Sequence, residues 1–292
     1  MSLSKESSWQ HLALPLLFVV LYGSGFVGAK LGLPHAGPFT FLTLRFGLAA
    51  LVMAAIAFVL KAPWPTSRQE WLHIAGAGLL GVGMFSAGAY ASIERGVAPA
   101  VSALIIALNP IIVAIAAGPL LGERTNSRQF VGLMIGIFGV FLVLRGRLGI
   151  DPSYLGAVLL SVVALFGLAC GNLYQKRHCT SMNLFTGGAV QCGACTVAMA
   201  IGMALTDEKP LQLAPEFFAA WLWTGLVVSI GAVSILYVMI RRAEVSRVAS
   251  VFFLMPVSAA ILSYALFGQT LDTVAVVGIG VTAIGVFLAQ KR

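Results

Sequence analysis

The sequence contains ten apolar runs, each about 20 residues long and therefore able to cross the ~30 Å hydrocarbon core of a membrane as one helix. Only short connections separate them, so no soluble domain fits in between. With 59% hydrophobic and 10% charged residues, the chain also has too little charge to cover a surface in water. The sequence therefore predicts an all-α integral membrane protein with ten transmembrane helices. We place the spans at 12–33, 38–60, 71–93, 98–118, 128–145, 154–174, 183–205, 216–239, 248–267 and 273–290.

The second half of the chain repeats the first after a shift of 146 residues, half of the total length of 292. Glycines and prolines, which fix backbone geometry, carry most of the matches. Among the matched pairs are Gly25–Gly171, Lys30–Lys176, Pro110–Pro256 and Gly139–Gly285. We therefore expect two five-helix domains, residues 1–146 and 147–292. Because five is odd, the second domain enters the membrane from the opposite side, and such inverted repeats are typical of alternating-access carriers.

The basic residues are unevenly distributed over the connections. Of 18 Lys and Arg residues, twelve lie in tails and loops on the side of the termini and four on the other side, and Lys30 and Arg45 lie within spans. This positive-inside bias predicts that both termini face the cytoplasm. The net charge of +8 thus reports topology, and we expect membrane lipid rather than nucleic acid as the surrounding partner.

The stretch LYGSGFVGAK, residues 21–30, allows two interpretations. At about 100° per residue, Gly25, Gly28 and Gly32 form one smooth stripe that lets other helices approach closely. Ser24 is alternatively the nucleophile of an intramembrane serine hydrolase, which requires a strained turn and a base within reach. The four histidines lie near span ends or in loops, so we expect Ser24 to help pack a helix and we name no catalytic residue.

Four motifs resemble the EamA type of the drug/metabolite transporter superfamily. They are LYGSGFVGAKLGL, with Tyr22 at the position of the usual tryptophan; FLTLRFGLAA, which contains Arg45; ALNPIIVAIAAGPLLGER; and VFFLMPVSAAILSYALFGQTL, in which Gln269 replaces the usual glutamate. The resemblance covers nearly the whole chain and is strongest to bacterial amino-acid exporters. It implies a carrier in which spans one, three, four, six, eight and nine surround a central cavity.

Polar and aromatic residues in these spans are the candidate substrate-binding residues: Tyr22, Phe26, Lys30, Ser86, Tyr90, Ser102, Asn109, Asn172 and Tyr237. Lys30 either extends to the outer interface or draws an anionic group such as a carboxylate into the cavity. The two asparagines are costly to bury unpaired, which favours a place at the cavity. Arg45 is interpreted as structural, held by neighbouring backbone carbonyls.

Pro110 and Pro256 occupy matched positions in the fourth and ninth spans. Each proline lacks an N–H donor and frees the carbonyl four residues earlier. A broken helix persists in a membrane where it lines a cavity or is buried in protein. We therefore expect these two prolines to be conformational hinges.

Other patterns limit the mechanism. No Asp or Glu lies in the middle of a span, which disfavours obligatory proton coupling and favours facilitated efflux or exchange. Cys192 and Cys195 have no second ligand pair, so we read them as small apolar side chains and expect neither metal nor cofactor. The small-residue face of Gly132, Gly136 and Gly139, mirrored in the tenth span, suits contact either between the halves or in a homodimer.

Together these features predict a non-enzymatic carrier that exports small metabolites, amino acids with apolar or aromatic side chains above all. One alternative keeps the fold and changes the cargo to drugs, nucleosides or sugar phosphates. Two others are a membrane scaffold that transports nothing and the intramembrane serine hydrolase.

Overall fold

The computed structural model describes residues 6–97, 99–123, 126–144, 155–267 and 273–290, and the described chain is helical apart from short connections. Six spans are continuous, long and apolar enough to cross a membrane. They are α1 (Glu6–Gly32); α2 (Pro38–Val59); α3 (Arg68–Gly78) with η1 (Leu79–Met84) and α4 (Phe85–Glu94); α8 (Leu155–His178); α9 (Leu184–Leu205); and α10 (Pro215–Leu222) with η4 (Trp223–Ala232) and α11 (Val233–Arg242).

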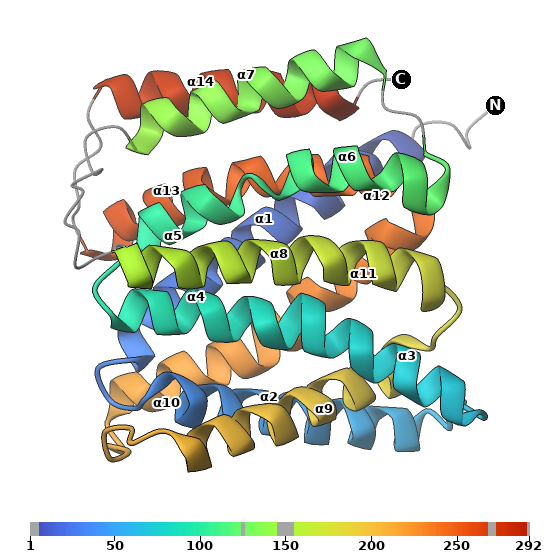
Figure 1. The fold of residues 1–292 in the computed structure, drawn as a ribbon, viewed down its shortest axis with the longest axis vertical. Coiled ribbons are helices and arrows are strands. Elements are labelled where there is room, and N and C mark those ends of the chain that lie inside the picture. Colours follow the sequence, from blue (N-terminus) through green and yellow to red (C-terminus); the bar gives the residue numbers. More distant parts are fainter. Residues whose placement is uncertain (1–5, 98, 124–125, 145–154, 268–272, 291–292) are drawn as a thin grey trace.

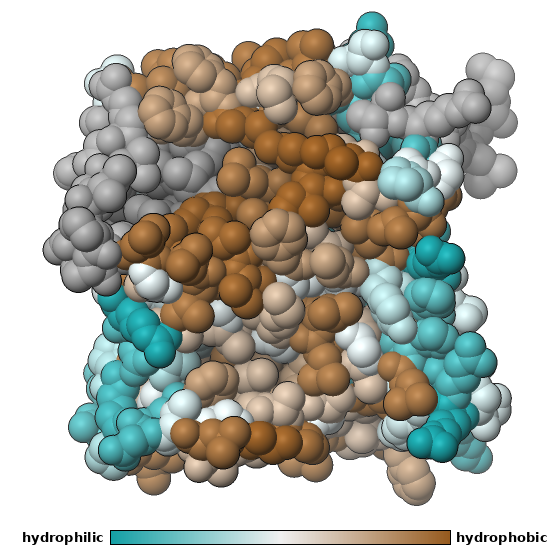
Figure 2. All heavy atoms as spheres, viewed as in Figure 1, coloured by the Kyte–Doolittle hydropathy of each residue, from teal (hydrophilic) through white to brown (hydrophobic). Residues whose placement is uncertain are grey.

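The other four spans are shorter or interrupted within the described residues. They are α5 (Pro99–Ile106) with α6 (Asn109–Leu121); α7 (Ser127–Leu144); α12 (Val245–Ser250) with η5 (Val251–Leu254) and α13 (Met255–Phe267); and α14 (Thr273–Gln290). Ten spans thus follow one another as the sequence predicted, and α1 begins at the end of the bundle where α14 ends (Figure 1). Hydrophilic residues gather at the two ends of the helices, with a hydrophobic band between them (Figure 2).

Corresponding helices of the two halves pack against each other at opposite edges of the bundle, α2 on α9 and α7 on α14 (Figure 1). The third span packs on α8, and its counterpart, the eighth span, packs on α1. A pseudo-twofold axis in the membrane plane produces this exchange of partners. The predicted fold of two inverted five-helix repeats is confirmed.

Departures from regular α-helix recur at matched positions. The π-helical segment η1 in the third span corresponds, after the 146-residue shift, to part of the π-helical η4 in the eighth. The fourth span is broken at residues 107–108, and the ninth is 3₁₀-helical at the equivalent place in η5. Each interruption ends two residues before one of the matched prolines, Pro110 and Pro256. The proline rule predicted these breaks, whereas hydropathy did not predict the π-helical segments.

Two of the matched glycines lie where helix backbones meet the π-helical segments. A Cβ atom on Gly171 of α8 would lie 2.2 Å from the Cα of Gly81 in η1. Its counterpart Gly25 in α1 faces η4, where a Cβ would come within 3.3 Å of Val228. At Gly171 only glycine permits this approach without displacement of the neighbouring helix, because the atoms it meets belong to the backbone. The repeat therefore preserves the contact that places α1 and α8 beside the irregular turns.

The small-residue face of α7 is used inside the chain. A Cβ atom on Gly132 would lie 2.5 Å from the backbone nitrogen of Ala289 in α14, and one on Gly139 would lie 2.5 Å from that of Thr282. Of the two roles that the sequence left open for this face, the structure therefore shows contact between the halves.

Candidate substrate-binding site

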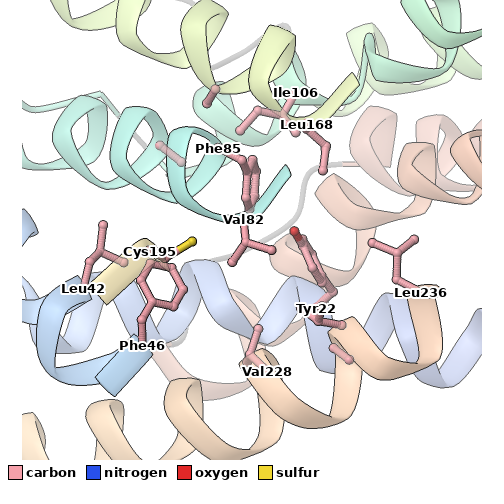
Figure 3. Packing of buried hydrophobic residues seen from close by; sticks show 14 of the residues in the cluster. Tyr22, Leu42, Phe46, Val82, Phe85, Ile106, Leu168, Cys195, Val228 and Leu236 are labelled. Carbon is pink, nitrogen blue, oxygen red and sulfur yellow. The ribbon is translucent and has the colours of Figure 1, made fainter. Parts of the chain in front are cut away.

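A cavity lies between α1, α2, α4 and η4. Its walls are formed by Tyr22, Gly25, Phe26, Arg45, Phe85, Ala89, Tyr90 and Val228. Figure 3 shows Tyr22, Phe85 and Val228, which come from three different elements, converging on this region. The space open to the centre of a water molecule is about 20 Å³, enough for one or two waters. A molecule larger than water enters only after the walls move apart.

Tyr22 is the centre of the aromatic part of this wall. Its ring lies 5.0 Å from Phe18, 5.7 Å from Phe85 and 5.9 Å from Phe252, measured between ring centroids. Phe252 belongs to η5, the 3₁₀-helical segment just before Pro256. The irregular part of the ninth span is therefore in direct contact with the cavity wall.

Arg45 brings a positive charge to the cavity. The side chain is 5% exposed and donates hydrogen bonds from Nε to Ser229 Oγ and from Nη1 to Tyr90 Oη, both at 2.9 Å. The guanidinium carbon also lies 5.4 Å from the centroid of the Phe46 ring. Its hydrogen-bond partners are thus hydroxyls of other spans, which differs from the backbone carbonyls expected from the sequence. Span two alone gives no sign of these partners, because they come from spans three and eight.

Tyr22, Phe26 and Tyr90, which were predicted together as site residues, line this cavity together. Ser102 instead belongs to a buried chain of hydroxyls. Ser92 and Ser161 lie 2.7 Å apart, and Ser161 donates to Ser102 at 2.9 Å. This chain joins the third, fourth and sixth spans.

The remaining predicted residues lie outside the cavity wall. Ser86, Asn172 and Tyr237 are buried in α4, α8 and α11, and Lys30 is half-buried in the last turn of α1. Asn109 begins α6 and is 0% exposed, and neither its amide nitrogen nor its amide oxygen has a hydrogen-bond partner in the described part of the chain. A role of these residues in binding stays a prediction.

Ser24 serves helix packing. Its hydroxyl donates to the carbonyl of Leu21 at 2.5 Å and accepts from Trp223 Nε1 at 2.8 Å, which ties α1 to η4. Neither partner is a base that activates a nucleophile. Cys195 is likewise used in packing, since its thiol donates to the carbonyl of Gly78 at 3.3 Å.

Polar contacts that sequence reasoning missed hold the two ends of the bundle. At the predicted cytoplasmic end, Lys176 Nζ donates to the carbonyls of Ile240 and Ala243 at the end of α11, both at 2.7 Å. At the opposite end, the Glu208 carboxylate accepts from the backbone N–H groups of Phe39 and Thr40 at 2.8 Å and so caps α2. Each contact joins segments that are far apart in the sequence.

A third set of hydrogen bonds links the fourth and ninth spans at the predicted cytoplasmic end. Glu123, just after α6, accepts hydrogen bonds from the backbone N–H groups of Val245 and Ser246 at 2.9 and 3.3 Å. A carboxylate at this position complements the positive end of the α12 dipole. Glu123 is the glutamate of the LLGER motif, so the motif has a visible structural use.

The model of the EamA-like transporter family matches the chain twice, over residues 9–145 and 155–290. The chain belongs to this family. Each half of the protein therefore carries one copy of the family pattern, and the family resemblance inferred from the motifs is confirmed. The protein is a membrane transporter of the EamA family.

Relatives of similar length are named as transporters. An "uncharacterized transporter" from Archaeoglobus fulgidus is 26% identical, over 98% of this chain and 99% of its own. A "probable amino-acid metabolite efflux pump" from Salmonella typhimurium is 25% identical over 94% and 93%. The "uncharacterized inner membrane transporter YedA" from Escherichia coli K12 is 25% identical over 92% of this chain and 87% of its own.

A solved crystal structure has the same fold. It superposes with a TM-score of 0.80 over 95% of both chains, with 16% sequence identity. At this level of identity the likeness concerns the architecture alone.

Proposed function

We propose that this transporter exports small metabolites, in particular amino acids with apolar or aromatic side chains, by alternating access. The observation that carries the proposal is the cavity itself, which combines the aromatic walls of Tyr22 and Phe26 with the cation of Arg45. Aromatic walls suit an apolar side chain, and a cation suits a carboxylate. The Salmonella relative, which is named as a probable amino-acid metabolite efflux pump, supports the same class of substrate.

The membrane would be the inner membrane of a bacterium, with both termini in the cytoplasm. No acidic residue lies in the middle of a predicted span, which favours facilitated efflux or exchange over proton coupling. The hydroxyl of Ser24, committed to a carbonyl and an indole, supports a function without covalent catalysis.

A flux assay with the purified protein in liposomes tests this proposal. Vesicles are loaded with a panel of labelled amino acids, and the release of each is compared with release from protein-free vesicles. We expect the fastest release for apolar and aromatic amino acids. Release no faster than from protein-free vesicles, for every amino acid of the panel, contradicts the proposed cargo.

A matched pair of variants then tests the site. Phe26→Ala removes an aromatic wall of the cavity, whereas Phe58→Ala removes a ring that is 81% exposed on the outer face of α2. We expect Phe26→Ala to slow the flux about ten-fold, since the loss of a buried aromatic contact costs on the order of 1–3 kcal/mol. Phe58→Ala should keep the flux of the parent protein.

A further inference from the structure

Arg45 is a buried cation for which the described part of the chain supplies no counter-charge. The ion pairs found there join Lys209 to Glu94 and Arg247 to Glu244, and neither involves Arg45. No carboxylate elsewhere in the sequence is placed to neutralise Arg45 either, because all ten acidic residues lie in connections, in tails or at span ends. A buried charge without an opposite charge is unfavourable, so an anion from outside the chain is expected to complete this site.

The groups that hold Arg45 position its guanidinium without neutralising it. Ser229, which accepts from Nε, gives its own proton to the carbonyl of Thr224 at 3.0 Å. Tyr90, which accepts from Nη1, donates to the carbonyl of Gly25 at 3.4 Å. Each hydroxyl therefore turns an oxygen lone pair toward Arg45 and carries no negative charge. The arrangement fixes the direction of the cation and leaves its charge available.

The guanidinium also has donors left over. Two hydrogen bonds use two of its five N–H groups, and the side chain borders the cavity. The planar guanidinium matches a carboxylate in a two-point contact. Arg45 is the one cation among the residues that line the cavity, which suits a singly charged carboxylate better than a phosphate ester with about two charges.

We propose that Arg45 binds the carboxylate of the transported substrate, whose side chain then lies against Tyr22 and Phe26. The inference rests on the proposed function and deepens it, because it makes the carboxylate the group that the substrate must carry. It also moves the anion contact from Lys30, the cation favoured by the sequence, to Arg45. An amine that lacks the carboxylate is then a poor ligand, whereas an acid that lacks the amino group still binds.

Competition experiments on the unmodified protein test this requirement. The amino acid with the fastest flux is challenged with its decarboxylated amine and with its deaminated acid. We expect the acid to inhibit the flux and the amine to inhibit about ten- to a hundred-fold more weakly, as for the loss of a charge-assisted hydrogen bond. Equal inhibition by the two compounds overturns the role of Arg45 and leaves the proposed function intact.

Variants separate the carboxylate contact from folding. Arg45→Gln should abolish inhibition by the acid, and Arg45→Lys, which keeps the charge but not the two-point geometry, should retain part of it. Arg177→Gln, which removes an exposed cation at the end of α8, is the matched control and should behave as the parent protein. Inhibition by the acid that persists unchanged in folded Arg45→Gln overturns the proposal.

A binding measurement keeps the two proposals distinguishable. The deaminated acid should raise the thermal unfolding temperature of the parent protein and not that of Arg45→Gln. If no amino acid crosses the membrane but this stabilisation is found, the cargo proposal fails and the carboxylate site stands. If the acid and the amine stabilise the parent protein equally, the carboxylate site fails.

Discussion

Asn109 is a buried residue whose side-chain amide has no hydrogen-bond partner in the described part of the chain. Both polar atoms of its amide lack partners in the described chain, and each unsatisfied buried group costs about 1–3 kcal/mol. The residue directly follows the break in the fourth span and directly precedes Pro110. A polar group kept at such a cost is consistent with partners that it acquires in another conformation or from a substrate.

Replacement of Asn109 by leucine, which branches at Cγ as asparagine does but carries no polar atom, should therefore separate stability from transport. We expect Asn109→Leu to raise the free energy of unfolding by about 1–3 kcal/mol, because two unsatisfied groups disappear, and to slow the flux. Thermal unfolding in detergent and the liposome flux assay measure the two effects. Ser102→Ala is the control, since it removes a satisfied hydroxyl and should lower stability. A destabilised Asn109→Leu protein contradicts this interpretation.

The sequence predicted three of the cavity residues and did not predict that Arg45 lines the cavity with them. Tyr22, Phe26 and Tyr90 could be predicted because they are large or polar residues in spans that the family resemblance places around the cavity. Arg45 was assigned to structure, because the residues that orient it, Tyr90 and Ser229, are 45 and 184 positions away. The absence of any acid in the middle of a span is the sequence signal that Arg45 has no counter-charge in the neighbouring spans.

At the level of helices, the α7–α14 pair shows how glycine position decides packing. The backbone of α14 approaches α7 so closely that a methyl group on Gly132 would lie 2.5 Å from Ala289 N and 2.7 Å from Gly285 O. These are backbone atoms and cannot rotate away. Gly280, also on α14, has no atom within 4 Å of its hypothetical Cβ. The same substitution should therefore have opposite effects at the two positions.

We expect Gly132→Ala to lower the free energy of unfolding by about 1–3 kcal/mol through overpacking. Gly280→Ala should be neutral, or stabilising by up to about 1 kcal/mol because alanine favours helix. Thermal unfolding of both variants in the same detergent makes the comparison. If Gly132→Ala instead leaves stability unchanged and dissociates a dimer in size-exclusion chromatography, the glycine face serves an interface between copies of the chain.

The elements differed in how well they could be predicted. Span limits follow from the length of apolar sequence, and the breaks before Pro110 and Pro256 follow from the missing N–H group. The π-helical segments η1 and η4 could not be predicted, because an extra residue in a turn leaves hydropathy unchanged. The two π-helical segments recur at matched positions of the repeat, beside Gly171 and Gly25. The matched glycines are therefore the feature of the sequence that goes with these segments.

For the whole molecule, the inverted repeat was predictable from the matched glycines and prolines, whereas the contacts that hold its ends were not. Those contacts join residues such as Lys176 and Ile240, or Glu208 and Thr40, that only the folded chain brings together. Alternating access requires that the contacts at one end break while those at the other hold. A probe at one end alone can test that requirement.

Cys179 is such a probe, because it lies in the connection after α8 and is 2% exposed. Burial raises the pKa of its thiol to about 11. The thiolate is the form that reacts, so at pH 7.5 the buried thiol is almost fully protonated and should react slowly with a maleimide, and faster as the pH rises. Opening of the predicted cytoplasmic end would hydrate the thiol, lower its pKa toward the ordinary value and increase labelling.

Lys176→Met should cause that opening. It removes two charge-assisted hydrogen bonds between α8 and the end of α11, and about 1.4 kcal/mol of lost stabilisation corresponds to a ten-fold larger open population. We therefore expect Cys179 labelling at pH 7.5, quantified by mass spectrometry, to become about ten-fold faster. Arg177→Gln, the exposed neighbouring cation, should leave the rate unchanged. Equal rates in the parent protein and Lys176→Met would mean that this lysine does not hold the end closed.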